Sequence, residues 1–185
     1  MKILFVCTGN ICRSPMAEAL LRHALTEVGI EGIEVASAGT WGNDGWTASD
    51  PAVHVLAQRG VDLSGHVARS LRAEDIEEAD LILVMTAHHA RDVVRLHPGA
   101  EAKTRYLKEL SELTPADLDP ASTPDRRLAA LLEVTRPPYR RDLELDDPYG
   151  LPVGVYERTA AEIERHVAKV VEILTGKAGA GQAGP

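Results

Sequence analysis

The stretch "VCTGNICRSP", residues 6–15, holds both cysteines of the chain, Cys7 and Cys12, and places Arg13 directly after the second. The five residues between Cys7 and Arg13 are enough backbone to wrap around one tetrahedral dianion, and Gly9 removes a side chain where the chain must turn tightly. The Cys7 sulfur would then lie beneath the phosphorus while the Arg13 guanidinium closes on two of the oxygens. Because the field that binds phosphate also favours a thiolate, Cys7 is a candidate nucleophile.

A strand and a helix are predicted on either side of this loop. "KILFV", residues 2–6, is a continuous apolar run typical of a strand buried on both faces. From Pro15 onward the apolar residues follow one helical stripe, which predicts a helix with Ser14 as the N-cap and Gly29 as the stop. A turn between a buried strand and a helix N-terminus offers unpaired N–H groups and the positive end of the helix dipole. The loop is therefore a ready anion site.

Strand-like and helix-like stretches alternate along the rest of the chain. The expected strands are 33–37, 79–86 and 104–107, and the expected helices are 49–60, 88–96, 126–134 and 155–174. This order predicts an α/β fold with a mostly parallel sheet, which binds ligands at the carboxyl ends of its strands. Residues 7–13 follow that end of the first strand.

The length of 185 residues and the hydrophobic content of 44% predict a single domain, which we place over residues 1–175. After residue 110 the alternation breaks, and an insertion at about 114–141 is either a surface excursion, the favoured interpretation, or a cover for the crevice. Residues 176–185 are small and polar, so a disordered tail is expected there.

The composition also limits the partners. A net charge of −8 argues against nucleic acid or an anionic membrane as the main partner. No apolar run approaches the roughly 18 residues that a membrane span needs, and the N-terminal apolar run is too short for a signal peptide, so a cytoplasmic protein is expected. In a reducing compartment two cysteines five apart are more often catalytic or redox-active than structural. Neither a metal nor another cofactor is expected, because no spaced His or Asp cluster occurs.

The loop resembles the signature of the low-molecular-weight protein tyrosine phosphatase family, in the bacterial branch that includes protein arginine phosphatases. The matching residues are Cys7, Thr8, Gly9, Asn10, Ile11, Cys12, Arg13, Ser14 and Pro15. The family's second motif, an aspartate followed by proline and an aromatic residue before the last helix, is matched by Asp147, Pro148 and Tyr149. The resemblance covers about residues 1–113 and 142–174. It implies a three-layer sandwich of four parallel strands flanked by helices, with the phosphate loop after the first strand.

The resemblance also implies an activity: hydrolysis of protein phosphotyrosine through a phosphocysteine intermediate, by a monomer or weak dimer whose partner is the phosphorylated protein substrate. Cys7 would be the nucleophile, Arg13 would bind the phosphate, and Asp147 would protonate the leaving group and then activate water. Asp146 competes for the acid role. Asp147 is preferred because the family places the acid immediately before the proline, whose restriction keeps the backbone extended.

Further residues match supporting positions of the family. The substrate-binding positions are Thr8, Gly9, Asn10, Ile11, Cys12, Ser14 and Tyr149, with the Ser14 hydroxyl on the thiolate and Tyr149 as one aromatic wall. Asn10, Ser37 and His66 match a polar network under the phosphate loop. Trp41 and Trp46 lie in the segment that supplies the opposite wall, and the spacing does not decide between them. The pair at residues 88–89, both histidines, is interpreted as an exposed helix start.

Alternatives stay open. Family members that act on phosphoarginine have a phosphate loop that resembles "CTGNTCRSPMAE". This chain has Ile11 where those members have the second threonine of that motif. The isoleucine side chain forms an apolar wall that favours a phenyl ring, and therefore phosphotyrosine as the substrate. Thioredoxin-coupled arsenate reductases share the fold but need further cysteines near the middle of the chain. A non-catalytic phosphoprotein-binding module would not need both Cys7 and Asp147. Cys12 either traps an oxidised Cys7 as a disulfide or packs as a small buried residue.

Overall fold

The computed structural model describes residues 1–113, 122–135 and 138–176. A four-stranded parallel sheet of order β2-β1-β3-β4 forms the middle layer. Its strands are β1 (Lys2–Cys7), β2 (Glu34–Gly39), β3 (Leu81–Val84) and β4 (Thr104–Tyr106). The central strands β1 and β3 are buried along almost their whole length, because helices cover both of their faces. The predicted parallel sheet is confirmed.

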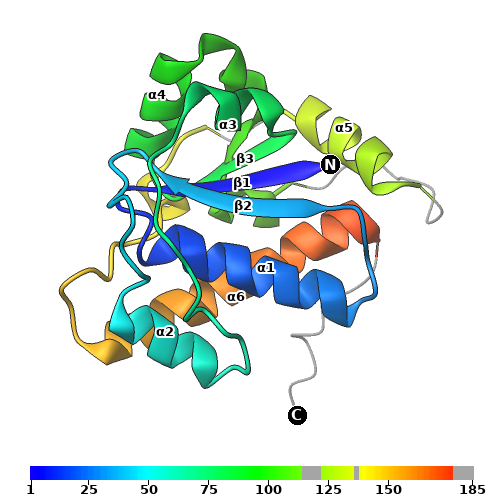
Figure 1. Ribbon diagram of the computed structural model, residues 1–185. Coiled ribbons are helices and arrows are strands. Elements are labelled where there is room, and N and C mark those ends of the chain that lie inside the picture. Colours follow the sequence, from blue (N-terminus) through cyan, green and yellow to red (C-terminus); the bar gives the residue numbers. More distant parts are fainter. Residues whose placement is uncertain (114–121, 136–137, 177–185) are drawn as a thin grey trace.

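Helices cover the two faces of the sheet separately (Figure 1). On one face lie α1 (Arg13–Glu27), α2 (Asp50–Ala57) and α6 (Val153–Thr175), and on the other lie α3 (Ala73–Glu78) and α4 (Ala87–Leu96). Alternate residues of β1 divide between the two cores: Phe5 packs in the cluster with α1 and α6, and Leu4 packs in the cluster with α3 and α4. The three-layer sandwich is therefore confirmed. Short 3₁₀ turns occupy Pro98–Lys103, Lys108–Ser111 and Arg141–Leu143.

The helix after β1 begins earlier than the sequence predicts. It starts at Arg13 with Cys12 at the N-cap position, so the prediction of Ser14 as the N-cap is wrong. The Ser14 hydroxyl instead forms hydrogen bonds with Cys7 and Asn10, and is unavailable to the helix end. The helix stops as predicted before Gly29, which adopts φ 68°.

Part of the insertion is a packed helix, α5 (Pro124–Glu133). Leu128 and Leu131 are buried in the same core as α1 and α6, and Arg105 in β4 donates a hydrogen bond to the Leu132 carbonyl at 2.9 Å. Figure 1 shows α5 at the end of the sheet where β1 begins, away from the loop after β1, so this helix does not cover the crevice. Residues 114–121 and 136–137 of the insertion, and the expected tail beyond Gly176, lie outside the described residues. Within the described ranges, every helix is too short or too polar to cross a membrane.

Candidate active site

The loop from the end of β1 to the start of α1, residues 7–13, is the segment that the sequence predicts as a phosphate loop. The carbonyl oxygens of its first five residues, 7–11, all accept hydrogen bonds from elsewhere in the chain. The donors are the backbone N–H groups of Thr40, Trp41, Asn43 and Ser49 and the Nε2 atom of His66, at 2.8–3.0 Å. The N–H groups of residues 8–12, by contrast, have no hydrogen-bond partner in the described part of the chain. A loop with its acceptors occupied and its donors free is a concave site for an anion.

Two glycines allow backbone segments to pack closely around the loop: Gly39 lies against the loop itself, and Gly42 lies against residues 69–70. A Cβ atom on Gly39 would collide with the Thr8 carbonyl oxygen, and one on Gly42 would collide with the backbone of Arg69. Neither residue has a positive φ, so glycine is needed at both positions only because a Cβ atom would not fit. The sequence analysis did not identify them, because the close approach depends on segments that are far apart in the chain.

Asn10 holds the middle of the loop in a left-handed conformation, with φ 55°. Its buried side-chain amide donates to Ser14 Oγ at 2.9 Å and to Ser37 Oγ at 2.8 Å, and its Oδ1 accepts from the backbone N–H of Arg69 at 3.0 Å. These bonds offset the cost of the strained backbone. The network that the resemblance implies among Asn10, Ser37 and His66 is therefore present.

Cys7 ends β1 with its side chain buried, and its Sγ lies 3.0 Å from Ser14 Oγ. Because Ser14 Oγ accepts from Asn10, the hydroxyl proton of Ser14 is free to point at the sulfur. The Ser14 hydroxyl can therefore donate a hydrogen bond to the Cys7 sulfur. The loop thus supports a nucleophile at the carboxyl end of the sheet.

Arg13, at the start of α1, is almost fully buried and reaches across to the chain before α6. Its Nη1 donates to the Leu145 carbonyl at 3.1 Å, and its Nη2 donates to Asp147 Oδ2 at 2.6 Å. Its Nε is buried and has no partner among the described residues. A buried donor left unpaired beside free loop N–H groups suits an additional anionic oxygen.

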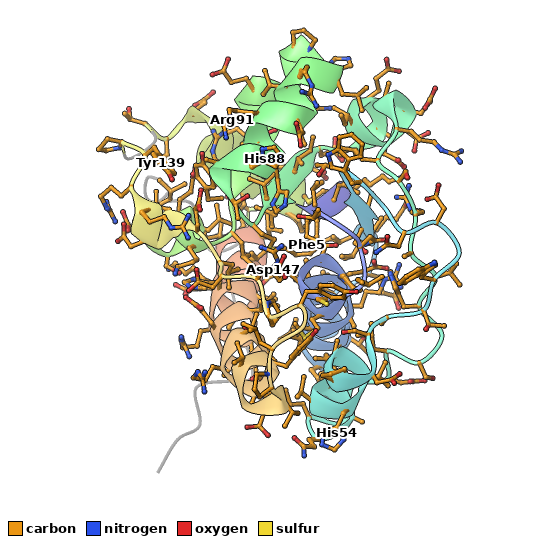
Figure 2. All side chains as sticks on the ribbon, turned by 90° about the vertical axis from the view of Figure 1, so that its left-hand side faces the viewer. Phe5, His54, His88, Arg91, Tyr139 and Asp147 are labelled. Carbon is orange, nitrogen blue, oxygen red and sulfur yellow. The ribbon has the colours of Figure 1, made fainter. Side chains whose placement is uncertain are left out.

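The segment 144–150, called the acid loop, is fixed to the sheet. The Leu145 N–H donates to the Met85 carbonyl after β3 at 2.8 Å, and the Tyr149 N–H donates to Asp147 Oδ1 at 3.1 Å. Figure 2 looks onto the carboxyl ends of the strands and shows Asp147 near the centre of this face. Asp146 instead points to solvent, with its side chain 89% exposed, and contacts Arg141. Of the two aspartates, Asp147 is the one beside Arg13.

A pocket of about 260 Å³ opens above the loop. Its lining residues are Cys7, Thr8, Gly9, Ile11, Cys12, Arg13, Trp41, Asn43, Trp46, Asp147 and Tyr149. The aromatic side chains at its mouth, Trp41, Trp46 and Tyr149, are 59–70% exposed. Both tryptophans therefore line the pocket together with Tyr149, a choice that the sequence left open. Flat apolar walls over an anion site suit an aromatic ring that carries a charged group.

His89 is a site residue that the sequence analysis missed, and the prediction that it lies exposed is wrong. It is buried under the loop, with Nε2 2.9 Å from Thr8 Oγ1 and Nδ1 3.0 Å from Thr86 Oγ1. Burial, and then the charge of Arg13, lowers the pKa of His89 to about 3, so the ring is neutral. The sequence offered one indication of this burial: Val93, which is buried, follows His89 by four residues, so both side chains lie on the same face of the helix.

Cys12 packs on the other side of the loop. Its Sγ lies 3.3 Å from Ser49 Oγ and 3.4 Å from the Tyr156 hydroxyl, and burial raises the pKa of its thiol. Both cysteines are free thiols. Across residues 1–113, 122–135 and 138–176, no group of three or more His, Cys, Asp or Glu side chains is placed to hold a metal ion.

Comparison with known proteins connects this geometry to a family. A family model described as low molecular weight phosphotyrosine protein phosphatase matches residues 2–120. The probable low molecular weight protein-tyrosine-phosphatase EpsP of Ralstonia solanacearum is 45% identical over 117 residues, 63% of this chain and 75% of its own. A protein-arginine-phosphatase of Geobacillus stearothermophilus is 34% identical over 94% of this chain and 95% of its own. The crystal structure of a low molecular weight protein tyrosine phosphatase from T. tengcongensis superposes with a TM-score of 0.72 at 35% identity, covering 93% of this chain and 98% of that one. The chain belongs to the low molecular weight phosphotyrosine protein phosphatase family.

Proposed function

We propose that this protein hydrolyses phosphotyrosine in protein substrates through a phosphocysteine intermediate, without a metal ion. The observation that carries the proposal is the polarity of the phosphate loop: the carbonyl groups of residues 7–11 are occupied from outside, and the N–H groups of 8–12 have no partner in the described chain. Cys7 and the unpaired Nε of Arg13 border the same pocket. A phosphate dianion would satisfy these donors while presenting its phosphorus to the sulfur.

In the first step the Cys7 thiolate attacks phosphorus and an S–P bond forms as the P–O bond to the tyrosine ring breaks. The electron pair of that bond goes to the phenolic oxygen, which takes a proton from the Asp147 carboxyl. Arg13 and the loop N–H groups balance the charge on the equatorial oxygens throughout. The products of this step are tyrosine and phosphocysteine.

In the second step water attacks the phosphocysteine while the Asp147 carboxylate takes one of its protons. The S–P bond breaks, its electron pair returns to Cys7 as a thiolate, and inorganic phosphate leaves. The Ser14 hydroxyl, 3.0 Å from the sulfur, stabilises that thiolate as it reforms. Asp147 ends protonated and ready for the next cycle.

The walls of the pocket support phosphotyrosine as the substrate. Trp41, Trp46 and Tyr149 surround the mouth, and Ile11 presents a branched apolar surface inside it. An aromatic ring can span the distance from the mouth to the loop while packing against these side chains. A phosphoserine side chain is too short to do so.

Phosphoarginine is a second candidate substrate, because two relatives named protein-arginine-phosphatase match over 94% of the chain. Relatives named protein-tyrosine-phosphatase match over 55% to 63% of it. Ile11 favours phosphotyrosine nevertheless, since it replaces a hydroxyl-bearing residue with an apolar one at the pocket. The net charge of −8 supports a protein substrate over nucleic acid, and we expect a cytoplasmic monomer or weak dimer.

The test compares wild type and Cys7→Ser. Wild type should hydrolyse p-nitrophenyl phosphate equally with and without EDTA, and Cys7→Ser should lose turnover while still binding inorganic phosphate, because the loop N–H groups and Arg13 are intact. Isothermal titration with phosphate measures the binding. Turnover by Cys7→Ser, or wild-type activity abolished by EDTA, would overturn the mechanism. Thioredoxin-dependent arsenate reduction without phosphatase activity would identify the reductase alternative instead.

A further inference from the structure

A larger pocket of about 1000 Å³ lies beyond Asp147, between α4 and the chain that leads into the acid loop. Its lining residues are Thr86, Ala87, His88, Ala90, Arg91, Val94, Arg95, Glu101, Thr104, Tyr106, Tyr139, Arg141 and Glu144. We call it the α4 groove. None of the catalytic groups proposed above lines it, and the chemistry of the reaction does not explain it.

A smaller hollow next to the α4 groove and the catalytic pocket shares lining residues with both. This hollow, of about 250 Å³, shares Thr8, Arg13 and Asp147 with the catalytic pocket. The same hollow shares His88 and Arg141 with the α4 groove. Figure 2 shows His88 and Arg91 above Asp147, and Tyr139 to the upper left, all on the face that carries the strand ends. A chain whose phosphorylated residue enters the catalytic pocket can therefore extend into the groove.

The inner surface of the groove is apolar. Ala90 and Val94 contribute the α4 side, and Tyr106 packs against Tyr139 with ring centroids 5.9 Å apart. Tyr139 is 53% exposed, and its hydroxyl is held by a hydrogen bond to Glu144 Oε1 at 3.0 Å. An aromatic side chain fixed by its hydroxyl and open on its face is suited to pack against another apolar side chain.

The rim of the groove carries charges of both signs, in a chain where acidic residues outnumber basic ones 28 to 20: Arg91, Arg95, Arg141, Glu101 and Glu144. Arg95 is neutralised by Asp92 at 2.8 Å, and Arg141 by Glu144 at 2.7 Å. Arg91 is exposed on α4 and forms no ion pair with the described residues. Charge complementarity therefore favours an acidic group at Arg91.

We propose that the α4 groove binds the substrate polypeptide beside the phosphorylated residue, with an acidic side chain at Arg91 and an apolar or aromatic one against Tyr139. The proposal rests on the proposed function and adds a preference for sequence around the phosphorylated site. An extended chain advances about 3.3 Å per residue, so the groove reads positions a few residues from the phosphate. The insertion thereby contributes Tyr139 to substrate selection although its helix α5 packs elsewhere.

The experiment measures kcat/KM on matched phosphotyrosine peptides whose flanks, on both sides, carry acidic plus aromatic residues, alanine, or lysine. Each value is divided by that of the same variant on p-nitrophenyl phosphate, which has no flanks. Wild type should favour the acidic-aromatic peptide over alanine about three- to fivefold, the size expected of one exposed ion pair with some apolar contact. Arg91→Glu should abolish or invert the preference, and Tyr139→Ala should reduce it.

Arg126→Glu is the matched control, since Arg126 is exposed on α5 and the charge change is the same. It should retain the wild-type preference. Equal use of all peptides by active wild type, a preference that survives Arg91→Glu, or an equal loss in Arg126→Glu would overturn the subsite while leaving the phosphatase proposal intact. Failure to hydrolyse p-nitrophenyl phosphate would instead overturn the proposed function itself.

Discussion

Arg13 Nη2 donates a hydrogen bond to Asp147 Oδ2 at 2.6 Å, so the cation proposed to bind phosphate forms an ion pair with the proposed general acid. A phosphate dianion competes with Asp147 for the same guanidinium. When the dianion binds, a phosphate oxygen replaces the Asp147 oxygen on Arg13. This exchange leaves the Asp147 carboxyl free to face the oxygen of the leaving group.

We expect Asp147→Ala to lower kcat by roughly 10² to 10⁴ for a substrate with a poor leaving group such as phenyl phosphate, because general acid catalysis is lost. The loss on p-nitrophenyl phosphate should be much smaller, since its leaving group needs little protonation. Inorganic phosphate should inhibit the variant more tightly, because Arg13 loses its competing partner. Asp146→Ala, at the exposed neighbour, should reduce kcat less. Equal losses on both substrates would contradict the acid role.

Gly39→Ala should weaken phosphate binding, because the new methyl group collides with the Thr8 carbonyl and moves the phosphate loop. The inhibition constant for phosphate should rise, and the melting temperature should fall. Gly65→Ala is the control, because a Cβ there meets nothing within 4 Å and no positive φ is involved. Wild-type phosphate affinity in folded Gly39→Ala would show that the close approach does not shape the loop.

His89 should make the protein sensitive to acid. Its pKa is about 3 in the folded protein, against 6.5 when unfolded, so the unfolded state binds the proton first as the pH falls. The contribution of the neutral ring to the free energy of unfolding is complete above pH 6.5 and is lost as the pH falls toward 3. At pH 4 the loss amounts to about 3 kcal/mol.

The measurement is the free energy of unfolding by denaturant at pH 7 and at pH 4. His89→Asn is less stable at pH 7 because the bonds to Thr8 and Thr86 are disturbed, but it should lose less stability between the two pH values than wild type. His88→Asn, at the exposed neighbour, should follow the wild-type curve. Parallel curves for wild type and His89→Asn would disprove the buried neutral state.

The sequence predicted the order of strands and the site motifs because both depend on local patterns. Buried strands are continuous apolar runs, and the phosphate loop lies between one such run and a helical stripe. What it missed depends on contacts between distant segments. His89 faces the loop only because α4 packs on the sheet, and Gly39 matters only because the end of β2 lies against Thr8. The local sequence around Ser14 is typical of an N-cap, but the Ser14 hydroxyl forms hydrogen bonds with Cys7 and Asn10 instead. The α4 groove includes Tyr139, which lies in a part of the insertion where the sequence predicts no helix or strand.

Cys12 should protect the enzyme from peroxide. Peroxide converts the Cys7 thiolate to a sulfenic acid, and the Cys12 sulfur can then attack it to form a disulfide with loss of water. Dithiothreitol should restore more activity to oxidised wild type than to oxidised Cys12→Ser. Because burial raises the pKa of the Cys12 thiol, the protection should increase with pH. Equal recovery of the two proteins would mean that Cys12 serves only to pack beside Ser49 and Tyr156.

Ile11 should select phosphotyrosine over phosphoarginine. Its side chain lines the catalytic pocket and is only 6% exposed, so its shape is fixed by packing. Ile11→Thr replaces apolar surface with a hydroxyl, which removes packing against a phenyl ring and offers a polar partner to a guanidinium. The ratio of kcat/KM on phosphotyrosine and phosphoarginine peptides should fall roughly tenfold. Ile11→Val, which stays branched and apolar, should keep most of the wild-type ratio. A wild type that already prefers phosphoarginine, or a ratio unchanged in Ile11→Thr, would show that another part of the pocket makes the selection.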